Sequence, residues 1–316
     1  SGWYGLGRPK MALRRSNELF EILNMRVAIY GRKITKQTLS AFNEVFETIL
    51  SFGWSILLEE DLSESLIQKA SVTFPFKTFG STIDLPSDID MVISIGGDGT
   101  FLKSVEYVRD SEIPILGINA GRLGFLANVS REHIQEALGL VRDKKYIFQK
   151  RSLLTVSVDG LQGEKDFFAM NELAIHKKDT SSMINLNVLL DGNFLNTYWS
   201  DGLIISTPTG STAYNLSCGG PIVAPGCQVH ILTPIAPHNL NVRPMVIPDH
   251  MPITLNVEGR GRSYLMSIDG KSHSIKQGQE ILVKKADFMI NVIKFENNNF
   301  LDTIRNKMLW GIDKRN

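Results

Sequence analysis

The sequence predicts an α/β domain with a parallel sheet, followed by a β-rich domain. In the first half, short apolar runs alternate with amphipathic helical patterns, as in strands that are joined by helices. In the second half, strand patterns follow one another, and several are separated by Asp-Gly turns. The chain has 316 residues, of which 43% are hydrophobic and 21% are charged, so two domains can each bury a core.

The elements of the first half place glycine-rich loops at one edge of the predicted sheet. We expect strands at 27–30, 54–58, 91–95 and 115–118, and helices at 38–52, at 62–70 and from GGDGT to about residue 108. Right-handed crossovers bring the carboxyl ends of parallel strands to one edge, where ligands bind in Rossmann-like sheets. Gly31, the GGDGT sequence at 96–100 and the segment 119–124 fall on that edge.

The second half is expected to form an antiparallel β domain. Its predicted strands are 153–158, 167–175, 185–190, 203–206, 253–257 and 264–268, and a further strand pattern covers 288–295. The expected domains are an α/β domain at 25–152, completed by the tail 284–316, and a β-rich domain at 153–283. Residues 1–24 are expected to be an extension, disordered or of cloning origin, because Met25 opens the first strand at once.

Composition argues against several classes of partner. Lys and Arg total 34 against 33 Asp and Glu, so the net charge of +1 favours neither nucleic acid nor an anionic membrane. Cys218 and Cys227 fit a reducing cytoplasm, and we expect both to be buried, unpaired thiols. The segment 202–242 has no charged residue, but its Gly, Pro, Ser and Thr residues exclude a membrane helix. We expect it to be buried in a core or in a subunit interface.

The GGDGT sequence indicates a phosphate site. Gly96, Gly97 and Gly99 leave room for anionic oxygens to approach the backbone N–H groups at a helix start. The Asp98 carboxylate stands among groups that favour anions, which points to phosphoryl chemistry with a metal or a transferable proton. The alternative is a glycine-rich turn in which Asp98 is only the N-cap of the helix.

A second loop, TPTGSTAYNLSCGG at 207–220, follows a predicted strand in the same way. Its hydroxyl groups can bind base or ribose groups without adding charge, and Tyr214 offers a flat apolar face. This chemistry suits a nucleoside better than a bare phosphate. The alternative is a helix start whose Thr and Ser side chains bond backbone N–H groups.

Five motifs together carry a family resemblance. They are GGDGT at 96–100, NAGRLGFL at 119–126, NE at 171–172, SDGLIISTPTGSTAYNLSCGGP at 200–221 and PHNLNVRP at 237–244. With them the chain resembles the NAD kinase family, which transfers a phosphate to the 2′-hydroxyl of the adenosine ribose of NAD. GGDG alone is shared with lipid kinases, but the long motif is far more specific, and the resemblance covers most of residues 25–316.

The resemblance implies a set of site residues. Asp98 would be the catalytic residue that accepts the proton of the ribose hydroxyl, and 153–283 would be the NAD-binding domain. The implied NAD contacts are Asp98, Gly99, Lys103, Phe125, Asn171, Glu172, Ser182, Trp199, Asp201, Thr209, Thr212, Ala213, Tyr214, Asn215, Leu216, Ser217, Ala236, Asp269 and Lys271. The weaker candidates for ATP phosphate binding are Arg32, Lys33, Gly96, Gly97 and Thr100.

Some of these placements have a plainer alternative or depart from the family pattern. Lys103 lies one turn into the predicted helix, where a solvated helix face explains it equally well. Ser182 and Trp199 stand where relatives often carry His or Arg, and Lys271 stands where some relatives carry Gln. The six histidines are scattered and form no metal cluster, and for His238 we favour a structural hydrogen-bonding role.

The resemblance also implies the partners of the chain. The substrates would be NAD and ATP, with polyphosphate as a possible donor, and a divalent metal such as Mg²⁺ would be held by ATP with help from Asp98 rather than by a dedicated protein cage. The protein would be a cytoplasmic homodimer or homotetramer with a NAD site shared between subunits. Two other functions remain open: a diacylglycerol-type lipid kinase, and a non-catalytic NAD-binding regulator.

Overall fold

The structure, a computed structural model, describes residues 25–32, 34–69, 73–80, 85–121, 124–160, 166–178, 182–296 and 299–309. The chain forms two compact units: unit 1 is Ser1–Phe148 with Val292–Asn316, and unit 2 is Gln149–Asn291. The expected extension at 1–24 and the candidate phosphate contact Lys33 lie outside the described residues.

Unit 1 is built on a parallel sheet, as predicted. Its strands run in the order β5-β4-β1-β2-β3, and the last residues of β18 pair with β5. Every pair in this row is parallel. The strands are β1 (Arg26–Tyr30), β2 (Ser55–Glu59), β3 (Lys77–Phe79), β4 (Met91–Gly96) and β5 (Ile115–Asn119), and the short β6 (Val129–Ser130) also pairs with β5.

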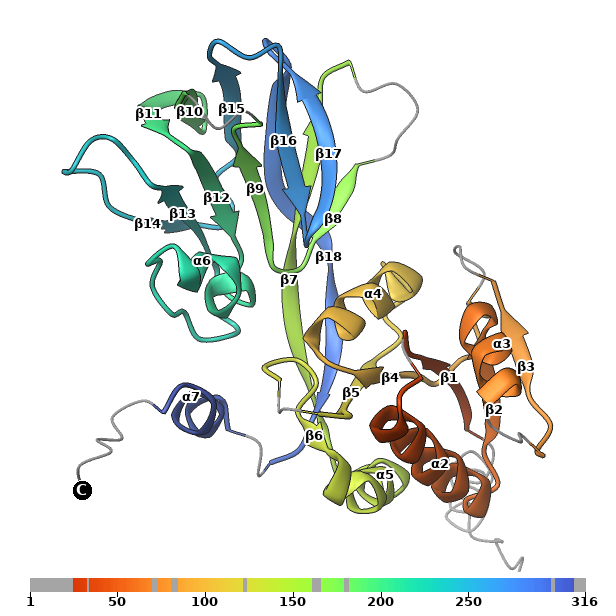
Figure 1. Ribbon diagram of the computed structural model, residues 1–316. Coiled ribbons are helices and arrows are strands. Elements are labelled where there is room, and N and C mark those ends of the chain that lie inside the picture. Colours follow the sequence, from red (N-terminus) through yellow and green to blue (C-terminus); the bar gives the residue numbers. More distant parts are fainter. Residues whose placement is uncertain are drawn as a thin grey trace, which may run out of the picture. The chain divides into compact units, whose positions relative to one another are not determined.

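Helices cover both faces of this sheet. The helices α2 (Lys36–Ser51) and α5 (Ile134–Arg142) lie side by side and pack their apolar sides on one face (Figure 1). A capping box formed by Thr35 and Thr38 begins α2. The helix α4 (Asp98–Val108) covers the other face, where Phe101 packs on Gly117 of β5 so closely that a side chain at Gly117 would collide with it. The remaining helices are α3 (Glu60–Lys69), α7 (Phe300–Met308) and the 3-10 turn η1 (Arg131–His133).

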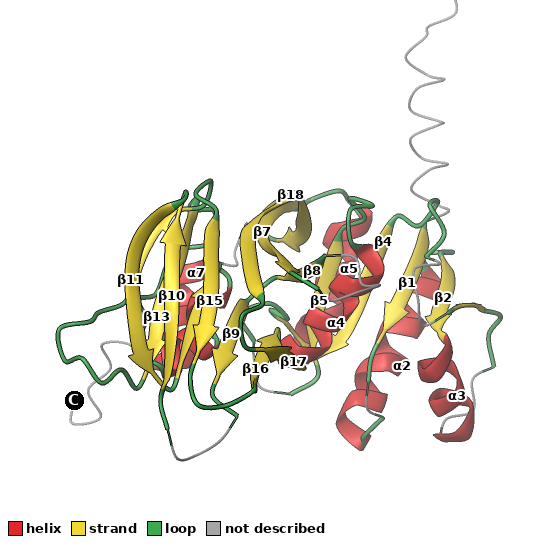
Figure 2. Ribbon diagram, turned by 90° about the horizontal axis from the view of Figure 1, so that it is seen from above, coloured by secondary structure: helices red, strands yellow, loops and turns green. Residues whose placement is uncertain are grey.

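Unit 2 consists mainly of two antiparallel sheets with a shared apolar core, as predicted for a β-rich domain. One has the order β11-β10-β15-β18, and Figure 2 shows β11, β10 and β15 side by side. The other has the order β14-β13-β12-β9-β16-β17, and β7 pairs with β8. The strands are β7 (Ile147–Val158), β8 (Phe167–Ala169), β9 (Glu172–His176), β10 (Ile184–Leu190), β11 (Asn193–Ser200), β12 (Gly202–Ser206), β13 (Val229–Ile235), β14 (Met245–Pro248), β15 (Ile253–Glu258), β16 (Ser263–Ile268), β17 (Lys271–Lys276) and β18 (Glu280–Lys294).

Several expectations need correction. The single strand expected at 167–175 is two strands, β8 and β9, with a break at Met170 and Asn171. The run at 288–295 is the end of the much longer β18. Both cysteines are unpaired, but Cys218 is only half-buried and Cys227 is exposed, because each lies in a loop and not in a core strand.

The charge-free segment 202–242 is buried only in part. Its strands β12 and β13 are almost wholly inside unit 2, whereas residues 238–242 of the following loop are exposed or half-exposed. Leu240 in that loop is 83% exposed. None of the helices in the described ranges is long and apolar enough to cross a membrane.

Candidate functional site

The GGDGT segment lies at the carboxyl edge of the unit 1 sheet, as predicted. In the register of the parallel pair β4 and β5, Gly96 stands opposite Asn119, so the two glycine-containing loops leave the sheet at the same level. Gly97 is the N-cap of α4 and makes no side-chain cap, and Asp98 is the first residue of the helix. The interpretation of Asp98 as an N-cap residue is therefore wrong, because its carboxylate bonds to another loop.

That loop holds the Asp98 carboxylate through three consecutive backbone N–H groups. Oδ2 accepts from Phe125 at 2.9 Å, and Oδ1 accepts from Leu126 at 2.9 Å and from Ala127 at 3.1 Å. Charge-assisted bonds of this kind fix the carboxylate more firmly than neutral ones would. A side chain at Gly124 would collide with the same carboxylate, so the glycine at this position makes the close approach possible.

A cation from the other end of the chain also reaches Asp98. The Nζ atom of Lys307, in the last turn of α7, lies 3.4 Å from Asp98 Oδ2. The same Nζ atom lies 4.3 Å from the centre of the Phe125 ring, which is a cation–π distance. Sequence reasoning did not single out Lys307, because the tail had no strong pattern and the contact spans 209 residues.

These donors do not leave Asp98 suited to hold a magnesium ion. A carboxylate has about four lone-pair positions, and three N–H groups and an ammonium group already point at this one. An ammonium group also repels a second cation. Among the described residues, no group of three or more His, Cys, Asp or Glu side chains is placed to bind a metal ion. In this arrangement Asp98 is therefore not a ligand for a metal ion.

The start of α4 is open to a ligand. A side chain added at Gly97 or Gly99 would meet nothing within 4 Å, so the backbone N–H groups there can be approached from outside. Thr100 packs on Gly96, and a methyl group at Gly96 would collide with it. Lys103 pairs with Glu106 at 3.3 Å on the same helix, and Arg32 is exposed after β1.

In unit 2, a second carboxylate holds a second loop in the same manner. The side chain of Asp269 accepts three consecutive backbone N–H groups, from Met170 at 2.7 Å, Asn171 at 2.9 Å and Glu172 at 3.0 Å. Asp269 itself has a φ of 46° in the turn between β16 and β17. It was expected among the NAD contacts, and the structure shows that its carboxylate supports the Asn-Glu pair.

Glu172 is a strongly perturbed acid of unit 2. It is only 9% exposed, and its Oε2 atom has no hydrogen-bond partner. Burial, with a smaller contribution from the negative charge of Asp269, raises the pKa of Glu172 to about 8, although a hydrogen bond from the backbone of Tyr214 opposes the shift. At neutral pH this carboxyl group is largely protonated, so it can donate a hydrogen bond as well as accept one.

The loop at 207–217 packs directly on the segment that carries Glu172. The Thr207 hydroxyl donates to the Met170 carbonyl at 2.6 Å, and the Thr207 N–H donates to the Asn171 carbonyl at 2.9 Å. The loop forms the short helices η2 (Gly210–Thr212) and α6 (Tyr214–Ser217), and neither has a side-chain cap. The Thr207 hydroxyl does accept from the N–H of Gly210, the first residue of η2, at 3.2 Å, so the alternative of Thr and Ser side chains bonding backbone N–H groups is confirmed in part.

Only some of the candidate side chains in this loop are accessible. Asn215 is fully buried, and its amide bonds to Ser211, Pro221 and Thr233 inside unit 2. Thr209 is buried and accepts from Arg151, and Thr212 bonds to the carbonyl of Thr209. Ala213 and Leu216 are half-buried and Ser217 is exposed. Tyr214 is 37% exposed and lies beside His176, with 5.6 Å between the ring centres.

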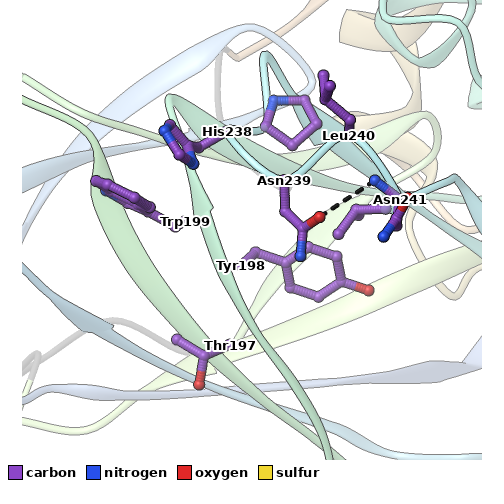
Figure 3. A pocket seen from close by; sticks show the side chains of 9 residues that line it. Thr197, Tyr198, Trp199, His238, Asn239, Leu240 and Asn241 are labelled. Carbon is purple, nitrogen blue, oxygen red and sulfur yellow. Dashed lines mark hydrogen bonds between the residues drawn. The ribbon is translucent and has the colours of Figure 1, made fainter.

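The described residues also line an open pocket of about 510 Å³ in unit 2. Figure 3 shows Trp199 and His238 facing each other at its rim, and the two rings are tilted by 34° with their centres 4.0 Å apart. The His238 N–H also donates to the Trp199 carbonyl at 2.9 Å. The remaining lining residues are Thr197, Tyr198, Pro237, Asn239, Leu240, Asn241 and Val242.

The other candidates are more dispersed. Asp201 lies between β11 and β12 and pairs with Lys177 at 2.5 Å. Ala236 precedes the pocket loop and has a φ of 44°. Ser182 is half-buried just before β10, and Lys271 is exposed at the start of β17.

Comparison with known proteins finds relatives that match both units. A family model described as the ATP-NAD kinase N-terminal domain matches residues 27–146, and one described as the ATP-NAD kinase C-terminal domain matches residues 170–295. The NAD kinase of Flavobacterium psychrophilum is 47% identical over 294 residues, which cover 92% of this chain and 100% of that protein. The chain belongs to the NAD kinase family. The NAD kinase of Bacteroides fragilis is 44% identical over 291 residues, with 92% of this chain and 100% of that protein covered.

Solved NAD kinase structures have the same fold. The crystal structure of yeast NADH kinase complexed with NADH has a TM-score of 0.81 at 24% identity, and the match covers 92% of this chain and 89% of that one. An NAD kinase from Archaeoglobus fulgidus in complex with ATP has a TM-score of 0.70 at 25% identity, covering 90% and 99%. The family assignment makes this chain a kinase and does not favour the lipid kinase or the non-catalytic regulator.

Proposed function

We propose that the protein transfers the γ-phosphoryl group of ATP to the 2′-hydroxyl of the adenosine ribose of NAD, giving NADP. The observation that carries this proposal is the position of Asp98, a carboxylate fixed by three backbone N–H groups at the start of an open glycine turn. Such a turn suits phosphate oxygens, and a fixed carboxylate beside it suits a hydroxyl that must lose its proton.

In this reaction the residues of unit 1 bind the phosphate groups of ATP and orient the ribose hydroxyl. The N–H groups at Gly97 and Gly99 bind phosphate oxygens of ATP, and Arg32 adds a positive charge on the same edge of the sheet. Asp98 orients the ribose hydroxyl and accepts its proton. Mg²⁺ carried by ATP neutralises part of the phosphate charge. Much of the rate enhancement comes from holding the two nucleotides in line.

The residues of unit 2 bind the adenosine half of NAD. Asn171 and Glu172 contact the ribose, and the protonated Glu172 donates a hydrogen bond to a ribose oxygen. The partly exposed Tyr214 ring offers a face to the adenine. Buried side chains such as Asn215 and Thr209 keep the loop in shape, and their contribution to binding is indirect.

We also propose that the protein is a homodimer or homotetramer in which the pocket face of unit 2 meets another subunit and completes its NAD site. Two exposed apolar side chains that line the pocket support this: Trp199 is 50% exposed and Leu240 is 83% exposed. Leu240→Asp should convert the oligomer to monomers in light scattering, with a loss of NAD affinity. A wild-type protein that is monomeric at micromolar concentration would refute this part of the proposal.

One assay tests the reaction itself. Purified protein is incubated with Mg²⁺, ATP labelled in the γ-phosphate, and NAD, NADH or diacylglycerol as the acceptor. We expect label in NADP, with the phosphate at the adenosine 2′ position in phosphorus NMR. Transfer only to the lipid, or no transfer to any acceptor by a folded protein, would overturn the proposal. Replacing ATP by polyphosphate in the same assay defines the range of donors.

A further inference from the structure

The Asp98 carboxylate has no acceptor position left for a substrate hydroxyl. Three backbone N–H groups and the Lys307 ammonium group together match the four or so lone-pair positions of a carboxylate. A hydroxyl group that is to give its proton to Asp98 must first donate a hydrogen bond to it. One of the four donors must therefore move when the substrate binds.

Lys307 is the donor that can move. The other three are backbone groups of consecutive residues in one loop, so displacing any of them would leave a polar group without its partner. The Lys307 contact is the longest of the four at 3.4 Å, and the side chains of Lys307 and Asp98 are 34% and 29% exposed. A partly exposed ion pair of this kind contributes little stability.

A second partner is ready for the displaced ammonium group. The Lys307 Nζ atom already lies 4.3 Å from the centre of the Phe125 ring. Phe125 also donates its N–H to Asp98, so the ring stays at this place as long as the loop is bound. A cation–π contact is attractive even at an exposed site. The ammonium group can thus leave the carboxylate and remain within a few ångströms of it.

We propose that Lys307 occupies the acceptor position of Asp98 that the ribose hydroxyl takes, and that the displaced ammonium group then stabilises the transferred phosphoryl group. This inference rests on the proposed function. In the step itself the hydroxyl oxygen forms a bond to the γ-phosphorus, and the bond from that phosphorus to the bridging oxygen breaks. ADP leaves with the electron pair of that bond, and the hydroxyl proton passes to Asp98 Oδ2.

The kinetic test replaces Lys307 by Met, which keeps most of the length of the side chain and removes its charge. We expect kcat to fall about 10²-fold, as for the loss of one group that stabilises transition-state charge. The KM for NAD should stay the same or fall, because the hydroxyl no longer competes with a cation. Lys307→Arg should recover part of kcat, and methylammonium or ethylammonium should partly rescue Lys307→Ala.

Arg305→Met is the matched control. Arg305 lies on the same helix and pairs with Asp302, so its loss removes the same charge from α7 without touching Asp98. We expect kcat within twofold of the wild type. A folded Lys307→Met protein with wild-type kcat would overturn the proposal. An equal loss in Arg305→Met, or a higher KM for NAD with unchanged kcat, would overturn it as well.

A binding experiment separates this inference from the proposed function. Calorimetry compares NAD with an analogue that lacks the adenosine 2′-hydroxyl, on the wild type and on Lys307→Met. The variant should bind NAD about two- to fivefold more tightly, which corresponds to the strength of an exposed ion pair, and should bind the analogue unchanged. An equal change in affinity for both ligands would overturn the proposal that Lys307 occupies the position of the ribose hydroxyl, even if the wild type makes NADP. If the wild type makes no NADP, the proposed function fails, whatever these affinities are.

Discussion

A methyl group on Gly124 would occupy the position of the Asp98 carboxylate. Gly124 and Asp98 lie in different loops, and the glycine allows three N–H groups of its own loop to close around the carboxylate. Gly124→Ala should therefore force Asp98 out of place and lower kcat by about 10²- to 10⁴-fold, the range for a misplaced general base. Gly139→Ala is the control, because a side chain at Gly139 of α5 meets nothing within 4 Å and should slightly stabilise the helix. Wild-type turnover in Gly124→Ala would contradict this account of Asp98.

Asp98→Asn should reduce kcat by about 10²- to 10⁴-fold while the protein stays folded. An amide can still accept from Leu126 and Ala127, but it then presents its NH₂ group to both Phe125 and Lys307 and cannot take a proton. Stopped-flow and steady-state measurements of NADP formation give kcat, and circular dichroism reports the fold. Turnover within threefold of the wild type would show that proton transfer to Asp98 is not needed.

Asp269→Asn should weaken NAD binding more than it slows the chemical step. The variant leaves one of the N–H groups of Met170, Asn171 and Glu172 facing an NH₂ group, so the Asn-Glu segment loses its fixed geometry. We expect the KM for NAD to rise about tenfold or more, equivalent to one lost hydrogen bond to a charged group. Asp287→Asn, at an exposed position of β18, should leave KM unchanged. Equal KM values in the two variants would contradict a supporting role for Asp269.

Because of Glu172, the stability of the folded protein should fall as the pH rises above 5. Burial raises the pKa of Glu172 from 4.5 to about 8, so between these values the folded protein keeps a proton that the unfolded chain releases. The contribution of this group is therefore most favourable below pH 4.5 and is lost as the pH rises through 8. Glu172→Gln removes the dependence and should raise the melting temperature relative to the wild type at pH 8.5 but much less at pH 5. The exposed Glu136→Gln should show no such trend, and a difference that shrinks with rising pH would contradict the assignment.

In unit 2, the partly exposed Lys285 is the ion-pair partner of the buried Asp249, so we expect its loss to lower the stability of the protein strongly. Lys285 lies 2.6 Å from Asp249, whose side chain is 5% exposed, and burial lowers the pKa of the neighbouring His230 to about 4. Lys285→Met leaves the Asp249 charge unpaired and should lower the free energy of unfolding by about 3 to 5 kcal/mol. Combining it with Asp249→Leu should restore part of the loss in urea unfolding. The adjacent exposed Lys284→Met is the control, and similar losses in the two lysine variants would refute the pairing.

Sequence patterns predicted those parts of the site whose structure depends on residues that are close together in the sequence. An apolar run followed by glycines predicted β4 and the turn before α4, and the structure places the helix start at Asp98. The roles of Lys307 and Asp269 could not be predicted in this way. Lys307 meets Asp98 across 209 residues, and Asp269 bonds to N–H groups 97 to 99 residues earlier, so no local period or spacing marks either contact.

The break between β8 and β9 shows why one expected strand was wrong. The run 167–175 has the composition of one strand, but the N–H groups of Met170 and Asn171 bond to Asp269 and not to a neighbouring strand. A side chain far away in the sequence thus overrides the local preference for extended pairing. The buried environment of Glu172, just after this break, follows from the same arrangement.

The chain leaves unit 1 after Phe148 and returns to it at Val292, which affects the order of folding during synthesis on the ribosome. Unit 1 receives its last sheet partner only when the chain returns at Val292, after all of unit 2 has been translated. Until then the outer edge of β5 is covered only by the two residues of β6, and exposed strand edges invite pairing with other chains. The nascent chain cannot complete its first unit before its second, in contrast to the usual N-terminal-first order of domain folding.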